Sequence, residues 1–572
     1  MIRLFDQHVI RFQKELEGYW DFTPIASKDS LPLNYDYKMM VPGCWENNIK
    51  FYDYRGYGVY KKNVTLEKDS NIRLVFKGVS HTADIYLDGK HIAHHYNAFT
   101  EFSKVVANVK AGEHEIHVIA DNSFSEESSL HKPNDYYCYG GIIRPVVMET
   151  VPNVFIKRVQ FTPVLENEKW NAEIEVNIEN IANQSHKVKV SLNLDELSIG
   201  NDILNQWIEI EPTSEKTVKV VVAFDEIEPW IYKNPKLYML KSKLYCQGVD
   251  LPVDDLIERV GFRTIKIIEN EMLFNNLPVF IQGFNRHEDF NVAGCSIPSQ
   301  LLSVDLDFMI DLGSNAVRTS HYPNDERFLD MCDERGILVW EENHARGLGL
   351  SEMMNPNFEK QCEDCNREMV LSHYNHPCII MWGILNECDS TTDEGRRMYS
   401  KQFAQIKSLD QSRPLTFASN KYFKDICFDL VDIVSVNIYH GWYGEDRTVE
   451  QIEKSYMKLY EWIQSAKGRN KPIIISEFGA GALYGCRAPH RPKWSEERQL
   501  DIIKQSLSVY LNRPEIIGTY IWQFADCRVT DEIWGIKRPR GLNNKGIVDE
   551  YRRPKLAYHT VKEIYENNIK VW

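Results

Sequence analysis

The chain has 572 residues, and at about 100 to 200 residues per domain this length predicts two to four domains, of which we expect three. Hydrophobic residues make up 43% of the chain, enough for each domain to bury a core. The formal net charge is −15 and there is no long basic run, which argues against nucleic acid and anionic membranes as partners.

The N-terminal segment lacks an apolar run of signal-peptide length. No later segment approaches the roughly 20 apolar residues that a membrane-spanning helix needs. We therefore expect a cytoplasmic protein that does not enter a membrane.

The first two domains are predicted to be β-sandwiches. Residues 1–152 contain short β-type segments such as IRLVFKG and HEIHVIADNS, separated by Gly, Asn and Asp, and LDGK at 87–90 is typical of a hairpin turn. Residues 153–264 contain a second series of alternating strands, including WNAEIEVNIEN and EKTVKVVVAF. Their span of about 100 residues favours an immunoglobulin-like sandwich.

Residues 265–572 have a different pattern, in which apolar strands alternate with amphipathic helices. Eight such strands over this length predict a (β/α)8 TIM barrel. The eight segments are VFIQGFN, NAVRTSHY, ILVWEEN, IIMWGILNE, LTFASN, DIVSVNIY, PIIISEF and TYIWQF. TIM barrels carry their chemistry at the C-terminal ends of the strands, where Glu387 ends the fourth strand and Glu477 ends the seventh.

Two glutamates at facing strand ends indicate glycoside hydrolysis, which needs one carboxylic acid and one carboxylate. An isolated Glu at a strand end more often caps a helix or pairs with Arg, but two at these positions favour catalysis. Side chains from strands four and seven can converge to the roughly 5 to 5.5 Å of a retaining enzyme, and the pKa of one is then raised. We assign the raised pKa and the acid/base role to Glu387, beside Asn386, whose amide we expect to contact the sugar. Glu477 is the predicted nucleophile, with the lower pKa.

The chain resembles glycoside hydrolase family 2 over essentially its whole length. The segments that carry the resemblance are NAVRTSHYPNDERFLDMCDERGILVW (315–340), NHPCIIMWGILNE (375–387) and SEFG, which contains Glu477. The resemblance implies a jelly-roll sugar-binding domain, an immunoglobulin-like domain and a TIM barrel, in this order. It also implies that Glu387 is the acid/base and Glu477 the nucleophile.

Within that family, NNKG at 543–546 is similar to the Asn-x-Lys motif of members that act on β-glucuronides. Asn543 and Lys545 occupy the motif positions and would hold the substrate carboxylate. A uronate differs from a neutral hexose by one carboxylate, so a cation and a hydrogen-bond donor are suited to recognise it. Two contacts of about 1.5 to 3 kcal/mol each would discriminate against a galactoside by roughly 10² to 10⁴.

The resemblance implies four further substrate-binding residues. Asp135, on a loop of the first domain, would reach into the site and hold a sugar hydroxyl. Tyr439 and Tyr443 would lie beside the nucleophile and the substrate carboxylate, where a hydroxyl keeps Glu477 oriented and ionised. Trp522 would form an apolar floor for the sugar ring.

The sequence departs from the family pattern near two of these residues. NIYH at 437–440 stands where glucuronide-hydrolysing relatives resemble NRYY, so Ile438 replaces a charged residue. Pro539 stands where those relatives have an Arg, and it is flanked by Arg538 and Arg540. These departures concern the surroundings of the substrate carboxylate and of the sugar's C4 hydroxyl.

We thus predict hydrolysis of β-D-glucuronides to D-glucuronate and an alcohol with retention of configuration. A β-galacturonidase or dual β-hexuronidase is the first alternative, a β-galactosidase the second, and a binding protein with an inactive barrel the third. The mechanism needs neither a cofactor nor a metal. The expected partner is a small uronide or a uronide-terminated glycan, and the family implies a homo-oligomer, either a dimer or a tetramer.

Overall fold

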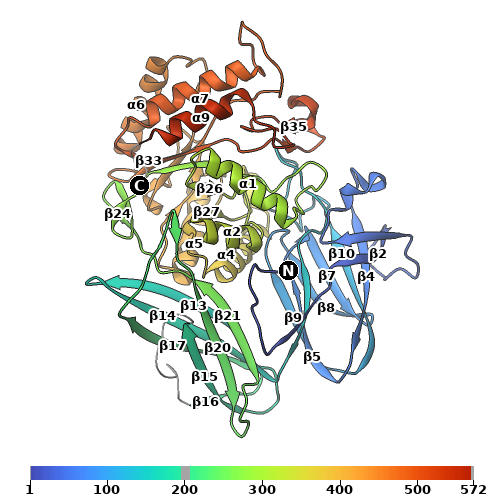
Figure 1. The fold of residues 1–572 in the computed structure, drawn as a ribbon. Coiled ribbons are helices and arrows are strands. Elements are labelled where there is room, and N and C mark those ends of the chain that lie inside the picture. The colour runs from blue at the N-terminus through green and yellow to red at the C-terminus, as the bar shows by residue number, and fades with distance from the viewer. Residues whose placement is uncertain (1, 195–206, 569–572) are drawn as a thin grey trace.

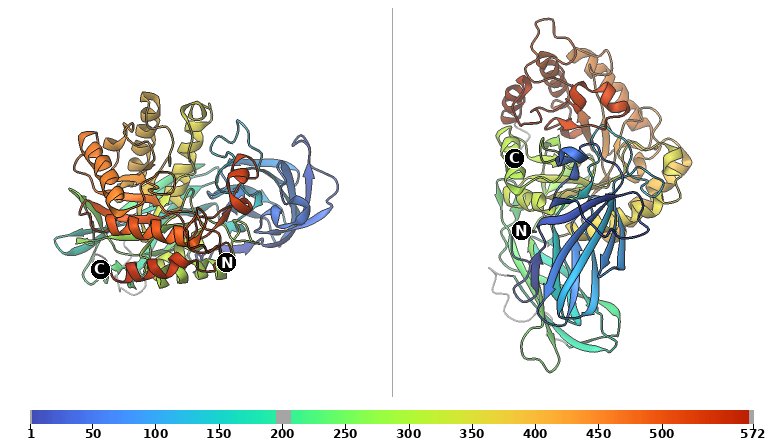
Figure 2. Two further views of the ribbon diagram at one scale, coloured as in Figure 1. Left: turned by 90° about the horizontal axis from the view of Figure 1, so that it is seen from above. Right: turned by 90° about the vertical axis from the view of Figure 1, so that its right-hand side faces the viewer.

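The computed structural model describes residues 2–194 and 207–568, which form three domains (Figure 1). The two N-terminal domains lie next to each other beneath the third, and the C-terminal helices cover the far side of the third domain. Figure 2 shows the same arrangement from above and from the right-hand side. Both N-terminal domains therefore contact the barrel.

The first domain is a sandwich of a four-stranded sheet, β1-β12-β5-β9, and a six-stranded sheet, β3-β2-β4-β10-β7-β8, both antiparallel. In β7 every second residue, Ala83, Ile85 and Leu87, is buried, which is the period-2 pattern of a half-buried strand. The strands are Phe12–Glu15 (β1), Gly18–Ile25 (β2), Tyr37–Val41 (β3), Tyr57–Leu66 (β4), Ser70–Phe76 (β5), Thr82–Leu87 (β7), Lys90–Tyr96 (β8), Phe102–Val109 (β9), Gly112–Asp121 (β10) and Val146–Val151 (β12).

The second domain packs a three-stranded sheet, β13-β14-β17, against a four-stranded sheet, β16-β15-β20-β21. Phe262 lies at the centre of its core, with four aromatic rings at centroid distances of 5.1 to 5.6 Å: those of Phe161, Trp170, Phe224 and Tyr238. The strands are Val154–Glu166 (β13), Lys169–Asn180 (β14), His186–Leu194 (β15), Ile208–Ile210 (β16), Ser214–Phe224 (β17), Tyr238–Cys246 (β20) and Asp254–Val260 (β21). The two predicted sandwiches are thus confirmed.

The third domain is the predicted TIM barrel, built on a parallel sheet in the order β29-β28-β27-β26-β25-β33-β32-β31-β30. Eight barrel positions give nine strands because Phe417 interrupts the fifth, so that β29 pairs with β28 and β30 pairs with β31. The strands are Ile281–Asn285 (β25), Ala316–Arg318 (β26), Leu338–Glu342 (β27), Ile379–Gly383 (β28), Leu415–Thr416 (β29), Ala418–Ser419 (β30), Val434–Asn437 (β31), Ile473–Phe478 (β32) and Ile516–Ile521 (β33).

Four helices of the barrel begin at side-chain caps, which are Asp325, Thr392, Thr448 and Ser495. Asp325 accepts a hydrogen bond from the Arg327 N–H at the start of α2, and Gly336, with φ of 73°, ends this helix in the left-handed region. The α-helices are Ser299–Asp311 (α1), Glu326–Arg335 (α2), Leu350–Met353 (α3), Phe358–His373 (α4), Asp393–Leu409 (α5), Val449–Ser465 (α6), Glu496–Tyr510 (α7), Ile533–Lys537 (α8) and Leu556–Glu566 (α9). Between the fifth and sixth barrel positions the chain forms only a 3-10 turn, Phe428–Leu430.

The first residues of the chain connect all three domains. Arg3 forms a buried bidentate ion pair with Asp330 on α2 of the barrel. Arg11 forms a similar pair with Asp254 of the second domain and a further bond to Glu149 of the first. Among the described residues, no helix is long and apolar enough to span a membrane.

Candidate active site

Glu387 and Glu477 line one cavity of about 560 Å³ at the C-terminal ends of the barrel strands. This volume lies within the roughly 300 to 1,000 Å³ of small-molecule sites. Glu477 belongs to β32, whereas Glu387 follows β28 on a turn where its φ is 53° and its N–H donates to the Ala418 carbonyl at 2.9 Å. Two strand ends thus direct both carboxylates into the same space.

Arg318, at the end of β26, holds one oxygen of Glu477 in place. Its guanidinium is fully buried and donates to Glu477 Oε1 at 3.0 Å and to Asn386 Oδ1 at 2.8 Å. Two further bonds of 2.9 Å bind it to both oxygens of Glu342. Because Glu342 fixes the guanidinium group of Arg318, this group sets the positions of both Glu477 and Asn386.

Tyr439 and Asn437 complete the contacts of the two glutamates. The Tyr439 hydroxyl donates to Glu477 Oε2 at 2.6 Å, so both oxygens of this carboxylate accept hydrogen bonds. Asn437, the last residue of β31, donates from Nδ2 to Glu387 Oε1 at 2.9 Å and accepts from the Ser476 hydroxyl at 2.7 Å. Each glutamate is therefore held by a neighbouring strand end.

The pKa of Glu477 is raised to about 7. Burial is the main cause and the nearby Glu387 adds to it, whereas Arg318 and Tyr439 act in the opposite direction. We expected Glu477 to keep the lower pKa of the pair. The structure differs because the Glu477 side chain is only 5% exposed, and burial raises its pKa.

Lys545 provides a buried positive charge in the same cavity. Its side chain is nearly inaccessible, at 2% exposure, and Nζ lies 5.8 Å from the ring centre of Tyr439 and 5.6 Å from that of Tyr443. Within the described part of the chain, no carboxylate lies within 4.0 Å of this ammonium group. A buried charge without a paired counter-ion is costly, so the site favours an anionic ligand here.

Asp135 reaches the cavity from the first domain and pairs with Arg538. Arg538 Nε donates to Asp135 Oδ1 at 2.8 Å, and a second bond joins Nη2 to Oδ2. Burial would raise the pKa of Asp135, but Lys545 and Arg538 outweigh it and lower this pKa. Asn543 does not line the cavity: it is fully buried behind it, where its amide donates to the Asp135 carbonyl at 3.4 Å.

Trp522 forms part of the cavity wall and is 3% exposed. Its ring stacks on His321 at a centroid distance of 5.1 Å, and His321 Nδ1 lies 2.7 Å from Glu342 Oε1. Asn386 is buried beside Glu387, and its Nδ2 has no hydrogen-bond partner among the described residues. Asn386 itself does not line the cavity.

The structure adds residues that the sequence analysis did not select, namely Arg318, Asn437, Arg346 and Trp534. Arg318 and Asn437 end barrel strands, so the rule that selected the glutamates could also have found them. Arg346 lies 4.0 Å from Glu387 and Trp534 belongs to α8. Arg346 is on the connection from β27 to β28 and Trp534 follows β33, the last barrel strand, and no local pattern marks either residue.

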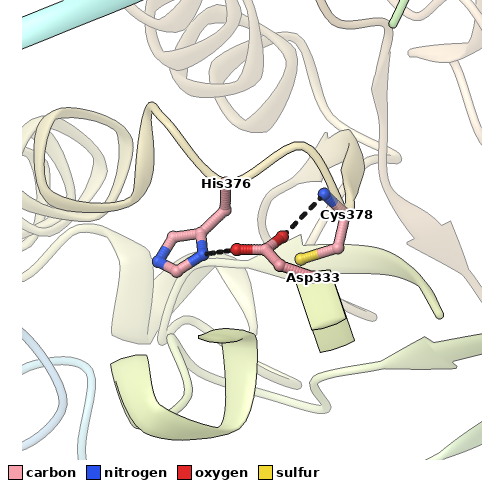
Figure 3. Close-up of side chains that lie close together, drawn as sticks. All are labelled: Asp333, His376 and Cys378. Carbon is pink, nitrogen blue, oxygen red and sulfur yellow. Dashed lines mark hydrogen bonds and ion pairs between the residues drawn. The ribbon is translucent and has the colours of Figure 1, made fainter. Parts of the chain in front are cut away.

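A separate group of potential metal ligands lies at the opposite end of the barrel strands. Figure 3 shows Asp333, His376 and Cys378, the one such trio found in residues 2–194 and 207–568. His376 Nδ1 lies 2.5 Å from Asp333 Oδ2, and the Cys378 N–H donates to Asp333 Oδ1 at 3.0 Å. Both contacts are made to Asp333 just before β28 begins, whereas Glu387 follows the other end of this strand.

The fold and this cavity define a class of protein: TIM-barrel glycosidases with two N-terminal β-sandwiches and a pair of buried glutamates. Sequence comparison agrees and is more specific. Residues 265–570 match the glycosyl hydrolases family 2 TIM barrel domain, residues 154–263 match glycosyl hydrolases family 2, and residues 43–163 match the glycosyl hydrolase 2 galactose-binding domain-like model. The chain belongs to glycosyl hydrolases family 2.

Three relatives illustrate the similarity. The crystal structure of a GH2 beta-galacturonidase from Eisenbergiella tayi bound to galacturonate is 44% identical, with a TM-score of 0.94 and all of both chains covered. The beta-D-glucuronidase of Dictyoglomus thermophilum is 27% identical, with a TM-score of 0.84 over 100% of this chain and 99% of that chain. A beta-glucuronidase of Streptococcus agalactiae is 28% identical over 96% of this chain and 95% of its own length.

Proposed function

We propose that this chain is an exo-β-glucuronidase that hydrolyses β-D-glucuronides to D-glucuronate and an alcohol with retention of configuration. Glu477 is the nucleophile and Glu387 the acid/base. Lys545 and Tyr443 bind the C6 carboxylate of the substrate, with Asn543 behind them. Asp135 and Asn386 bind hydroxyl groups of the sugar, and Tyr439 holds the nucleophile. Trp522 contacts the sugar ring.

The observation that carries this proposal is the buried ammonium group of Lys545. Asp135, whose pKa Lys545 helps to lower, already forms a bidentate ion pair with Arg538. A neutral hexose would leave the Lys545 charge uncompensated, whereas a uronate supplies the missing carboxylate. The C6 carboxylate of the substrate is thereby fixed beside Lys545, which lies on the chain segment that follows β33.

The proposed reaction has two displacements. Glu477 attacks the anomeric carbon while Glu387 gives its proton to the departing oxygen, which forms a glycosyl ester and releases the alcohol. Esterification removes the negative charge of Glu477, so Glu387 can then act as a base toward water. Arg318 and Tyr439, which bind both oxygens of Glu477, orient it for attack. No step requires a metal or cofactor, and we expect EDTA to leave the activity unchanged.

A β-galacturonidase is the second candidate, because the Eisenbergiella tayi relative has the higher identity of 44%. Galacturonate and glucuronate carry the same C6 carboxylate and differ only at C4. Lys545 would thus serve either substrate. The choice depends on the groups that face C4, and we propose Asp135, Arg538 and Arg346, three of the charged side chains in the cavity, for this role.

The test compares kcat/KM for three chromogenic substrates on the wild-type protein: a β-glucuronide, a β-galacturonide and a β-galactoside. The proposal expects the glucuronide to be preferred and both uronides to exceed the galactoside by about 10² or more. A preference for the galacturonide would select the second candidate. A preference for the galactoside would refute the uronide proposal.

We also propose that the protein is cytoplasmic and bacterial and forms a homo-oligomer, either a dimer or a tetramer. Family membership supports the oligomer, and the composition supports the location. Light scattering coupled to size-exclusion chromatography measures the oligomeric mass, and a monomeric mass would contradict this proposal. Limited proteolysis tests the predicted domain limits at residues 152 and 264.

A further inference from the structure

The cavity also includes a region that the proposed uronate site does not use. We call this region the arm. It lies between the chain segments that follow β30 and β31, where the barrel has a 3-10 turn in place of an α-helix, and it reaches α6. The residues that line the arm are Asn420, Tyr422, Phe423, His440, Asp446 and Lys458.

Two polar atoms in the arm lack a protein partner. Asn420 Oδ1 and His440 Nε2 are buried, and neither forms a hydrogen bond with any residue that the structure describes. The His440 side chain is 9% exposed. Buried polar atoms are normally hydrogen-bonded, so these two indicate a polar ligand.

The orientation of His440 is fixed by its other ring nitrogen. Nδ1 lies 3.4 Å from Asp446 Oδ2, and Asp446 itself accepts a hydrogen bond from the Ser455 hydroxyl at 2.6 Å. With the proton of a neutral imidazole on Nδ1, Nε2 carries a lone pair directed away from Asp446. The pKa of His440 is lowered by burial, which favours this neutral form. Nε2 is then an acceptor, as Asn420 Oδ1 is.

Aromatic surface accompanies these acceptors. The Phe423 side chain is 58% exposed and its ring contacts Trp462 of α6 at a centroid distance of 5.5 Å. Tyr422 also lines the cavity and is close enough to Glu387 and Glu477 for both to help raise its pKa. Two acceptors beside an apolar wall match a ligand with hydroxyl donors and a carbon face, which is the surface of a sugar ring.

We propose that the arm binds the leaving group and that this leaving group is a second sugar. The substrates are then oligosaccharides that end in a β-linked uronate, rather than uronides of apolar alcohols. Hydroxyl groups of the second sugar donate to His440 Nε2 and Asn420 Oδ1, and its carbon face contacts Phe423. This inference rests on the proposed uronidase function.

The test compares a disaccharide in which the uronate is β-linked to a hexose with the methyl uronide of the same acid. Both leaving groups are alkyl alcohols, but methanol is too small to reach the arm. We expect the wild-type kcat/KM for the disaccharide to exceed that for the methyl uronide by about 10-fold. His440→Ala and Asn420→Ala should each lower this ratio by about 3- to 10-fold. His559→Ala, on the exposed side of α9, is the matched control and should leave the ratio unchanged.

Three outcomes distinguish a failure of the sugar-binding arm from a failure of the proposed uronidase function. If the wild type hydrolyses the methyl uronide but both variants keep its substrate ratio, the sugar-binding arm is refuted while the uronidase function stands. A wild-type preference for a cyclohexylmethyl uronide, whose leaving group is also an alkyl alcohol, over the disaccharide would also refute it, in favour of apolar alcohols. If the wild type hydrolyses no uronide, the proposed function itself fails. Should His440→Ala be inactive toward both substrates, the Asn420→Ala ratio decides.

Discussion

At the scale of single residues, Glu477 is held more firmly than Glu387. Both oxygens of Glu477 accept hydrogen bonds, whereas the side-chain bond of Glu387 is to Asn437 through one oxygen. Glu387 is also the more exposed of the two. A nucleophile must keep one orientation, and an acid/base must exchange its proton with the leaving group and with water. The contacts therefore support the proposed division of roles.

The acid role of Glu387 predicts that the loss of activity in Glu387→Gln depends on the acidity of the leaving alcohol. Glu387→Gln cannot donate a proton, so kcat/KM for a methyl uronide should fall by about 10² to 10⁴. A 4-nitrophenyl uronide releases an acidic alcohol that needs little protonation, and its first displacement should be affected much less. Pre-steady-state kinetics with both substrates measures this difference. Equal losses in the two first steps would contradict the assignment.

Tyr439 predicts a change in the pH profile. The Tyr439 hydroxyl bond lowers the pKa of Glu477, so its removal raises this pKa further above about 7. Glu477 must be ionised to attack, so activity is lost as the pH falls through its pKa. In Tyr439→Phe the acidic limb of kcat/KM should move to higher pH by about one pH unit. Tyr484→Phe is the control, because this ring is exposed and lies outside the cavity lining. An unchanged acidic limb of the pH profile in Tyr439→Phe would refute the proposed effect of the Tyr439 hydroxyl on the Glu477 pKa.

At the scale of elements, the eight barrel strands could be predicted from apolar segments alone, because parallel strands buried on both faces give continuous apolar runs. The break at Phe417 could not, since nothing in the segment LTFASN marks a boundary at this residue and its division into β29 and β30 depends on pairing with two neighbours. The helix expected between the fifth and sixth positions is a 3-10 turn. The residues that line the arm lie on both sides of this turn in the chain.

The active site also contains residues that could be predicted from the sequence and residues that could not. Glu387 and Glu477 could be predicted because they end strands, and Arg318 and Asn437 follow the same rule. The pair of Asp135 and Arg538 could not, because it joins residues 403 positions apart on two loops of different domains. Whether a loop residue faces a cavity depends on tertiary contacts that have no periodic signal in the sequence.

The Asp135–Arg538 pair predicts an effect on substrate binding. In Arg538→Met the Asp135 carboxylate loses its partner and is free to neutralise Lys545, which then binds the substrate carboxylate more weakly. KM for the uronide should rise by about 10-fold or more. Arg540→Met is a matched control two residues away, because Arg540 is half exposed and pairs with Glu550. Equal KM values for the two variants would contradict the proposed balance of charges.

At the scale of the whole molecule, the first and second domains support the barrel through buried charges. Arg3 and Arg11, near the start of the chain, bond to acidic residues of three domains. The first domain also supplies Asp135 to the cavity. The active site is thus completed by contacts between domains, which the sequence indicates only through the resemblance to its family.

The buried Glu477 predicts a cost to stability at neutral pH. Its folded-state pKa of about 7 exceeds its ordinary value of 4.5, so the folded protein binds this proton more tightly. The associated stabilisation is present at low pH and lost as the pH rises from 4.5 to 7, by roughly 3 kcal/mol from (7 − 4.5) × 1.36. Glu477→Gln lacks this dependence. Scanning calorimetry from pH 5 to 8 should show the Tm of the variant rising relative to wild type, and parallel curves would contradict the raised pKa.

The central claim is that the buried charge of Lys545 selects a uronate, and one measurement tests it most directly. The ratio of kcat/KM for a chromogenic β-uronide to that for the matching neutral β-glycoside is measured in the wild type and in Lys545→Met. We predict that the variant loses about 10- to 150-fold in this ratio, because the loss falls on the charged substrate alone. An unchanged ratio in an active, folded Lys545→Met protein would contradict the claim.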